Sequence, residues 1–366
     1  MWSFRGKQRR VSGILVTIGA IALVTGCAST PAETPQEPVT EPTSSSDWDA
    51  IVAAAEQEGQ LQVWAELGTG VAEAVQEAFK QDYPEIEITV TSILPPNLTQ
   101  RVDAEQAADQ ATVDVVLQTN RGWRDAHAKD DYFAPIVGPD IVAADEQLRD
   151  GAAPVTSGAP IPTQVLYNDN KSVAAFFGPY GYAWNSEALD SPPESFESLF
   201  ADDTYRDRIG MNAPDASATT TGLYVLISER YPDVFTQLGE LNPTYFPNGS
   251  SLVQAMTAGA VDVAFTLNPS IAGENTGFAF DDEFPIPATA VFGEIISAAP
   301  NPNAAQLFAN WLATAGASAV LDEQTFIPIA PVSDGDLSIT DVEIYEEPPA
   351  DEVKAAQDRI NADLGR

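Results

Sequence analysis

The sequence predicts an α/β protein of two lobes, joined by a paired hinge and separated by a central cleft. Apolar runs of strand length alternate with amphipathic stretches of helical length from Trp48 onward, and this alternation occurs twice along the chain. Two extended segments rich in β-forming residues, 173–184 and 287–297, separate the two sets of elements. Because the chain crosses twice, each lobe is discontinuous, and a hinge of this kind allows closure around a ligand.

The elements expected in the first lobe follow one another in regular order. The pattern predicts helices over 47–57, 71–81 and 98–109, the first of them ending at Gly59. The second has a continuous apolar face, formed by Val71, Ala74, Val75, Ala78 and Phe79. Strands are expected over 61–65, 86–90 and 113–117. Strand-helix-strand units of this length favour a parallel sheet covered on both faces.

The second lobe repeats the pattern. Strands are expected over 208–211 and 261–265, and helices over 217–229 and 250–258. We therefore assign residues 47–175 and 287–325 to the first lobe and residues 176–286 to the second. Residues 326–366 are expected to form a helical segment that packs across both lobes.

The N-terminal segment has the order of a secretory signal. Met1–Arg10 contains four basic residues and no acid, and the apolar or small run Val11–Gly26 is shorter than the roughly 20 residues of a membrane span. Val24-Thr25-Gly26-Cys27 resembles a bacterial lipoprotein box and contains the only cysteine. The resemblance implies removal of residues 1–26 and acylation of Cys27, which anchors the protein in the bilayer on the extracytoplasmic face of the cell membrane. The alternative is a short uncleaved anchor, which leaves the rest of the chain outside the cytoplasm as well.

The proline-rich, acidic residues 27–46 lack large apolar groups and predict a disordered tether. The whole chain has 54 acidic and 17 basic residues, a formal net charge of −37. This charge repels nucleic acid and anionic lipid head groups, so neither is expected as a partner. Acylation of Cys27 leaves no thiol for a disulfide or a cysteine nucleophile. We expect a monomer without a cofactor.

Ligands of doubly wound sheets bind beyond the carboxyl ends of the strands, and this rule selects four loops. The first contains Glu66, Gly68 and Thr69, where glycine lets the backbone approach a ligand and backbone amides open the following helix. The second contains Asn120 and Arg121. An arginine at this position can clamp a carboxylate or phosphonate through paired hydrogen bonds, or pair with one of the many surface acids.

The third loop has the strongest pattern. Asp215, Ser217, Thr219 and Thr220 gather hydroxyl groups and free amides at a helix start, which favours an anion site because the N–H groups and the helix dipole point at the ligand. Helix capping by Asp215 or Ser217 accounts for only part of this cluster. The fourth loop contains Asn268, directly after the last strand of the second lobe.

Several stretches, taken in order, resemble the bacterial extracellular solute-binding proteins of ABC importers, in particular the ferric-iron-transporter type. The matching stretches are Tyr182–Leu189, Pro192–Pro193, Ser195–Leu199, Tyr205–Met211, Ser251–Gly259 and Asn301–Phe308. The resemblance extends from about Trp48 to the C-terminus. It implies the type II periplasmic-binding-protein fold, in which two lobes close on a small molecule or ion and deliver it to an ABC permease in the membrane.

Ferric members of this family coordinate iron with an adjacent tyrosine pair after the last strand of the second lobe. This chain has Pro269 and Ser270 there, so a small anionic organic solute is favoured over ferric ion or a ferric chelate. Ferric ion prefers hard oxygen ligands, and Tyr180 or Tyr182 can supply phenolates, with Glu66 or Asp215 adding a carboxylate. Whether a metal binds is left open.

Other functions have weaker support. The single histidine, His127, is flanked by charged residues and is expected on an exposed helix face. The chain has no G-x-S-x-G, H-E-x-x-H or P-loop motif. A secreted carboxylate-pair hydrolase stays open, because two acids brought together by folding leave no local signature. The other alternative is an adhesion or signalling lipoprotein on the same fold.

Overall fold

The computed structural model describes residues 45–93, 97–151, 164–189, 193–200, 203–273, 275–281, 286–330, 337–339, 341–345 and 347–366. The predicted signal peptide, the lipidation residue Cys27 and the tether up to residue 44 lie outside the described residues. Within the described part, no helix is both long and apolar enough to cross a membrane. The first described helix, α1 (Ser45–Glu58), begins two residues inside the predicted tether.

The larger of two sheets mixes parallel and antiparallel strands. Its nine described strands have the order β13-β6-β12-β3-β1-β2, with β14 and β4 pairing to β12 and β5 pairing to β6. Their bounds are β1 Gln60–Ala65, β2 Glu87–Ser92, β3 Val115–Gln118, β4 Phe133–Ala134, β5 Leu166–Tyr167, β6 Ser172–Pro179, β12 Ile286–Ile296, β13 Ile327–Pro328 and β14 Val342–Tyr345. We call this sheet and the helices on it lobe 1.

The smaller sheet has five described strands in the order β11-β7-β10-β8-β9. Their bounds are β7 Gly181–Asn185, β8 Ile209–Asn212, β9 Thr244–Phe246, β10 Val263–Leu267 and β11 Thr276–Ala279. We call this sheet and its helices lobe 2. Strands β8, β9 and β10 are parallel, whereas β7 is antiparallel to β10.

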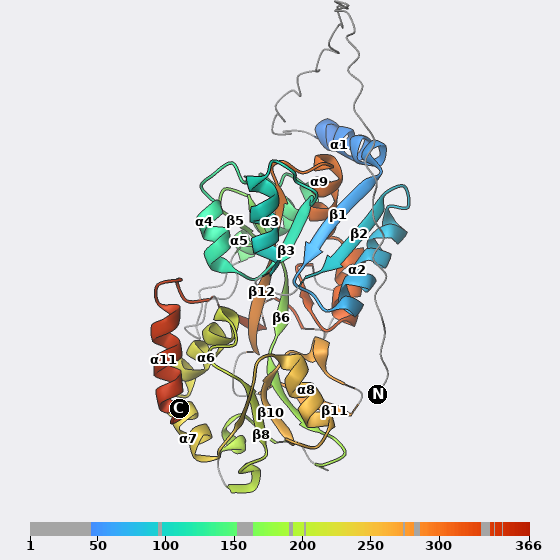
Figure 1. Ribbon diagram of the computed structural model, residues 1–366. Coiled ribbons are helices and arrows are strands. Elements are labelled where there is room, and N and C mark those ends of the chain that lie inside the picture. The colour runs from blue at the N-terminus through green and yellow to red at the C-terminus, as the bar shows by residue number, and fades with distance from the viewer. Residues whose placement is uncertain are drawn as a thin grey trace, which may run out of the picture. The chain divides into compact units, whose positions relative to one another are not determined.

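The predicted fold class is confirmed, and the parallel pairing expected of the strand-helix-strand units joins β1 to β2 and β3, and β8 to β9 and β10. The crossing strands are antiparallel. Strand β6 takes the chain from lobe 1 to β7 of lobe 2, and β12 brings it back. The two run in opposite directions, and they pair antiparallel from Ala288 opposite Pro179 to Gly293 opposite Val173. Figure 1 shows them side by side between the two sets of helices.

Eleven α-helices cover the sheets in the described part of the chain. Besides α1 they are α2 Thr69–Asp82, α3 Asn97–Ala107, α4 Arg121–His127, α5 Pro139–Gly151, α6 Ala218–Arg230, α7 Val234–Glu240, α8 Gly249–Thr257, α9 Pro302–Trp311, α10 Ala315–Glu323 and α11 Val353–Asp363. The helices and strands predicted above begin and end within two residues of the observed ones. Gly59, with a φ of 62°, ends α1 in the left-handed conformation that suits glycine.

Both sheets bury side chains on their two faces, as strands covered on both sides must. In β1, Leu61 and Val63 belong to one apolar cluster of lobe 1, whereas Trp64 belongs to another. In lobe 2, Phe265 of β10 belongs to one cluster and Ala264 to the other. The sheets are thereby fixed between helices, and the loops at their carboxyl ends are held in place.

The C-terminal segment differs from its prediction. Residues 326–366 were expected to be helical, but β13 pairs with β6 and β14 pairs with β12, both in the sheet of lobe 1. Among the described residues of this segment, only Val353–Asp363, helix α11, is helical, and it packs on α6 and α7 of lobe 2 (Figure 1). The run Val342-Glu343-Ile344-Tyr345 contains two β-branched residues and a tyrosine and so suits an additional strand, which periodicity over so short a stretch does not reveal.

An ion pair attaches this segment to lobe 2. Arg230 at the end of α6 donates to both carboxylate oxygens of Glu343 in β14, at 2.8 and 2.9 Å, and the Glu343 side chain is only 3% exposed. Such a buried carboxylate depends on its partner, because removing one member leaves an uncompensated charge.

We expect Arg230→Met to lower the free energy of unfolding by about 3 kcal/mol, because Glu343 would lose its bidentate partner. Urea unfolding measures this. Lys354→Met, which breaks the exposed pair of Lys354 with Asp358, is the matched control and should change stability little. Equal effects of the two substitutions would contradict a special role for the Arg230–Glu343 pair.

Candidate functional site

A network of polar side chains joins lobe 1, lobe 2 and the C-terminal segment. We call it the interlobe cluster, and its central members are Glu66, Thr119, Arg121, Thr219 and Glu347. The Thr219 hydroxyl donates to Glu347 Oε1 at 2.7 Å, and the Arg121 backbone N–H donates to Glu347 Oε2 at 3.1 Å. The hydroxyls of Thr119 and Thr219 lie 3.4 Å apart and connect the lobes directly.

The lobe 1 members are placed by the carboxyl ends of two adjacent parallel strands. Glu66 follows β1, and its backbone N–H donates to Leu117 O of β3 at 2.8 Å. Thr119 follows β3, and its backbone N–H and hydroxyl donate to Glu66 Oε2 at 2.9 and 3.0 Å. Asn120 then caps α4 by accepting from Trp123 N–H at 3.0 Å. The Arg121 N–H, in the first turn of α4, is thus available to a partner outside the helix.

The lobe 2 side is formed by the start of α6. Ser217 caps the helix by accepting from Thr220 N–H at 3.0 Å, and the Thr221 hydroxyl donates to Pro214 O at 3.0 Å. These local bonds fix the first turn in position. Thr219, between these residues, directs its hydroxyl to Glu347 and Thr119.

A second layer of buried polar groups lies behind the lobe 1 residues. Gln118 Nε2 donates to both oxygens of Glu294, at 3.2 and 3.1 Å, and both side chains are fully buried. Arg124 of α4 is 4% exposed and stacks its guanidinium 3.9 Å from the ring centre of Phe292. Its charge acts on Glu294 and on Glu347.

Buried polar atoms without a hydrogen-bond partner concentrate at this junction. Eight such side-chain atoms occur among the described residues, and four of them are Glu66 Oε1, Gln118 Oε1, Arg124 Nη1 and Asn212 Oδ1. Glu66 and Gln118 lie at the carboxyl ends of β1 and β3, and Asn212 ends β8, just before the loop that leads to Thr219. An unpaired buried polar atom costs about 1–3 kcal/mol, so this grouping makes the junction a candidate site for contact with a polar molecule.

Burial raises the pKa values of Glu66, Glu294 and Glu347. Burial raises the pKa of Glu66 to about 7, although hydrogen bonds from Thr119 lower it, and the charge of Glu347 raises it further. Burial raises the pKa of Glu294 to about 8, against the lowering effects of Gln118 and Arg124. The pKa of Glu347 is also raised by burial, opposed by Thr219 and the two arginines. At neutral pH the cluster therefore carries less negative charge than its three glutamates suggest.

The structure brings together only some of the residues that the sequence predicted. Glu66, Asn120, Arg121 and Thr219 belong to or support the interlobe cluster. Gly68 and Thr69 are exposed at the start of α2, and added Cβ atoms at Gly68 and Gly70 would meet nothing within 4 Å. No protein atom fills the space beside these glycines, and contact of Gly68 and Thr69 with a ligand stays a prediction.

In the second lobe, Ser217 and Thr220 serve the cap of α6, and Asp215 is exposed to solvent. Asn268 caps a short 3-10 helix by accepting from Ser270 N–H at 2.9 Å, and its amide lies close over Gly178 of the crossing strand β6. The hydrogen bonds of Ser217 and Asn268 fix the backbone of these loops.

The two predicted tyrosines lie away from the cluster's hydrogen bonds. Tyr182 is 2% exposed in the core of lobe 2, with its ring 5.6 Å from that of Phe196, so its prediction as a ligand residue is wrong. Tyr180 is half-buried at the crossing and packs edge-on against Tyr345, with ring centres 6.1 Å apart. Tyr182 belongs to one apolar cluster of lobe 2 and its neighbour Ala183 to the other, because both faces of β7 are covered, which the sequence alone did not show.

Three important members were missed from the sequence: Arg124, Glu294 and Glu347. Glu294 carried a signal, because it is the only acid in the apolar run Ile286–Ile296. Glu347 carried none, since it lies in a Glu-Glu-Pro-Pro stretch of an acidic chain. Tertiary structure alone brings it to Arg121 and Thr219.

No group of three or more His, Cys, Asp or Glu residues could hold a metal ion in the part of the chain that the structure describes. His127 of α4 is partly exposed, stacks on Tyr132 with ring centres 4.0 Å apart, and pairs with Asp103 at 3.4 Å. It contributes to packing on the outer side of lobe 1.

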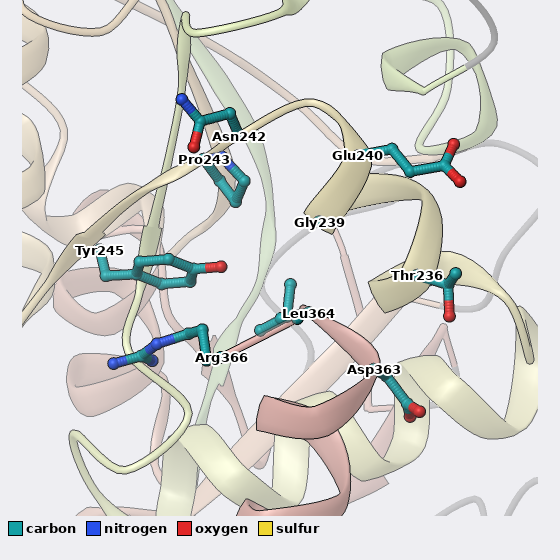
Figure 2. Close-up of a pocket in the computed structure, with 10 residues that line it drawn as sticks. Thr236, Gly239, Glu240, Asn242, Pro243, Tyr245, Asp363, Leu364 and Arg366 are labelled. Carbon is teal, nitrogen blue, oxygen red and sulfur yellow. The ribbon is translucent and has the colours of Figure 1, made fainter.

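A separate hollow lies in lobe 2 (Figure 2). It has a volume of about 420 Å³ and is formed by α7, the loop before β9 and the end of α11. Figure 2 shows Tyr245 and Arg366 at one side of it and Glu240 and Thr236 at the other, and the Arg366 guanidinium lies 4.2 Å from the centre of the Tyr245 ring. It contains none of the sequence-predicted site residues.

Solved structures place the architecture in a known class. A substrate-binding protein of an ABC transporter from Agrobacterium tumefaciens superposes with a TM-score of 0.64 at 13% identity, covering 83% of this chain and 94% of that one. AfuA from Actinobacillus pleuropneumoniae, with fructose-6-phosphate bound, gives 0.59 at 16% identity, covering 84% and 99%. Iron-bound HitA from Pseudomonas aeruginosa gives 0.58 at 16%, covering 82% and 99%. At these identities the likeness shows the fold, which is the type II periplasmic-binding-protein fold.

A search of curated protein sequences gives no significant match. The family model described as "Bacterial extracellular solute-binding protein" matches residues 74–344, and the chain belongs to that family. The family resemblance inferred from the sequence is thereby confirmed. The family's description places its members outside the cytoplasm.

The buried Glu294 provides a pH test of the cluster. Its raised pKa means that the folded chain holds a proton that the unfolded chain releases at lower pH, so this group's contribution to stability is present below about pH 4.5 and is lost as pH rises through about 8. We expect wild type to lose stability relative to Glu294→Gln between pH 5 and pH 8, by on the order of 1 kcal/mol or more. Urea unfolding at several pH values measures the difference.

Glu73→Gln, at an exposed position of α2, removes the same charge as a control. A difference between wild type and Glu294→Gln that stays constant from pH 5 to pH 8 would contradict the burial of a protonated carboxyl at this site.

Proposed function

We propose that this protein is the solute-binding component of an ABC importer, and that it captures a small organic solute with an anionic group at the interlobe cluster. The observation that carries the proposal is the grouping of unpartnered buried polar atoms, Arg124 Nη1 among them, where the carboxyl ends of strands from both lobes meet. Membership in the extracellular solute-binding family supports capture and delivery to a membrane permease.

The donors of the cluster support an anionic solute. Arg124 Nη1, the Arg121 N–H and the Thr219 hydroxyl come from both lobes, and charge-assisted hydrogen bonds to an oxyanion are the strongest that these groups form. Glu66 Oε1 and Gln118 Oε1 are unpartnered acceptors suited to hydroxyl or amine groups elsewhere on the solute. Together they favour a polar organic molecule with an acidic end over a bare ion.

The carboxylate-pair hydrolase stays the second candidate, because Glu66 and Glu347 are both partly buried acids and act on each other electrostatically. Family membership favours transport over hydrolysis. Hydrolysis of a bound solute by the purified protein would favour the hydrolase instead.

We further propose that Cys27 is acylated and that it holds a monomer on the outer face of the cell membrane. The lipoprotein box and the tether support this attachment. Cys27→Ala should move the chain from the membrane fraction into the soluble fraction on cell fractionation. Retention in the membrane would favour the uncleaved anchor.

The solute class is tested by thermal unfolding of the purified full-length chain. The panel comprises sugar phosphates, phosphonates, thiamine, polyamines, and ferric ion with and without citrate. A ligand at a hundred times its Kd adds about 2.7 kcal/mol of stability, a shift of a few degrees in Tm. We expect an anionic organic solute to give this shift. A shift given only by ferric ion would replace the anion proposal with the iron alternative.

For the solute found, we expect Arg124→Met to weaken binding by about tenfold or more, because a charge-assisted hydrogen bond to the solute is lost together with the stacking of the guanidinium on Phe292. Calorimetric titration measures the change. Arg101→Met is the matched control, since Arg101 stacks on Trp64 at 3.9 Å in lobe 1 outside the cluster. Equal affinities of the Arg124→Met variant and wild type would remove the cluster as the binding site.

A further inference from the structure

The carboxylate of Glu347 is bound by donors from both lobes. It accepts from the Arg121 N–H of lobe 1 and from the Thr219 hydroxyl of lobe 2, and the Arg121 guanidinium donates to the Glu347 backbone carbonyl at 3.2 Å. Anionic ligands are commonly bound in this way, by a backbone amide and a hydroxyl that donate to the carboxylate and by a guanidinium close to it. Here the anion belongs to the protein itself.

The side chain of Arg124 is separate evidence for an anion site, because it does not depend on the first turns of α4 and α6 that contain Arg121 and Thr219. Its side chain is 4% exposed, its Nη1 has no hydrogen-bond partner, and its positive charge is close enough to act on the Glu347 carboxyl. A buried guanidinium nitrogen without an acceptor points to an oxyanion with more oxygen atoms, or a different placement, than the Glu347 carboxylate offers.

The chain around Glu347 connects the lobes. Strand β14 ends at Tyr345 in the sheet of lobe 1, and α11 begins at Val353 on α6 and α7 of lobe 2. Gln357 of α11 also donates to the Thr221 hydroxyl at 3.1 Å. Glu347 is therefore tethered beside its partners from both ends, which gives it a high effective concentration there.

We propose that Glu347 is an internal carboxylate that occupies the binding position of the solute's anionic group, so that a solute must displace it to bind. The proposal rests on the proposed function, because it uses the same donors from Arg121 and Thr219. It makes Glu347 a specificity-determining residue.

The proposal defines the chemical class of the solute more narrowly. A carboxylate or phosphate group offers at least two acceptor oxygens, which can satisfy the Arg121 N–H and the Thr219 hydroxyl in place of Glu347. Phosphate has a further oxygen for Arg124 Nη1. A neutral sugar offers these donors only uncharged hydroxyl oxygens, which bind them more weakly than a carboxylate does, and a cation offers none. Both leave Glu347 in place, so the tethered carboxylate discriminates against such solutes.

The test uses acetate and inorganic phosphate as probes of the vacated position. Wild type, Glu347→Ala and Glu347→Gln are prepared as full-length chains, and thermal unfolding is followed while either anion is titrated against chloride at constant ionic strength. We expect both anions to raise the Tm of Glu347→Ala saturably by a few degrees, and to leave wild type nearly unchanged. Glu347→Gln should respond in the same direction but less, because its amide keeps one acceptor.

Glu73→Ala, with the same charge change at an exposed site of α2, should behave as wild type. Equal responses of all variants, or no response of either Glu347 variant, would overturn the proposal. If Glu347→Ala fails to fold, the Tm of Glu347→Gln in acetate and phosphate is compared with that of wild type. A larger response of Glu347→Gln supports the proposal, and an equal response overturns it.

The outcomes also separate this proposal from the proposed function. Glu347→Ala should bind the solute identified in the panel about tenfold more tightly than wild type does, because the competitor is gone. A solute that binds both chains equally keeps the transport function and overturns the role of Glu347. A response of Glu347→Ala to acetate and phosphate, without any organic solute for wild type, keeps the internal carboxylate and overturns the transport function.

Discussion

The arrangement of the two lobes depends on hydrogen bonds to charged groups at one place, where the carboxyl ends of the lobe 1 strands face those of the lobe 2 strands. Glu347 lies at this point and accepts hydrogen bonds from Thr219 of one lobe and Arg121 of the other. Removing a carboxylate from water is costly unless hydrogen bonds and nearby positive charge compensate it, and both are present here. This contact ties together the two lobes and the C-terminal segment, and any molecule that enters the cluster must compete with it.

The same constraint explains how an acidic protein can receive an anionic solute. Three glutamates, Glu66, Glu294 and Glu347, would repel an anion if all were ionised. Burial raises the pKa of Glu66 to about 7 and that of Glu294 to about 8, so part of this charge is neutralised by protons at neutral pH. Arg121 and Arg124, which both pair with Asp125, add positive charge that lowers the pKa of Glu347. The crossing strands and β14 fix these groups on a rigid sheet, which keeps the donors preorganised.

Local sequence patterns were sufficient for most of the fold and for part of the site. Strands and helices follow from apolar periodicity, and the rule that ligands bind beyond strand ends located Glu66, Arg121 and Thr219. The antiparallel pairing of β6 with β12 and the strand β14 depend on long-range pairing that no local pattern encodes. Glu347 is one acid among many in the sequence, and only folding places it 2.7 Å from Thr219. Tyr182 was misassigned because long-range packing covers both faces of its strand, and no local pattern shows this.

The most direct measurement is a crystal structure of the full-length chain with the identified solute. The account predicts an oxyanion of the solute within hydrogen-bond distance of the Thr219 hydroxyl, the Arg121 N–H and Arg124 Nη1, with the Glu347 carboxylate displaced from the first two. Solute bound in the hollow beside Tyr245 and Arg366, with Glu347 still held by both lobes, would contradict it.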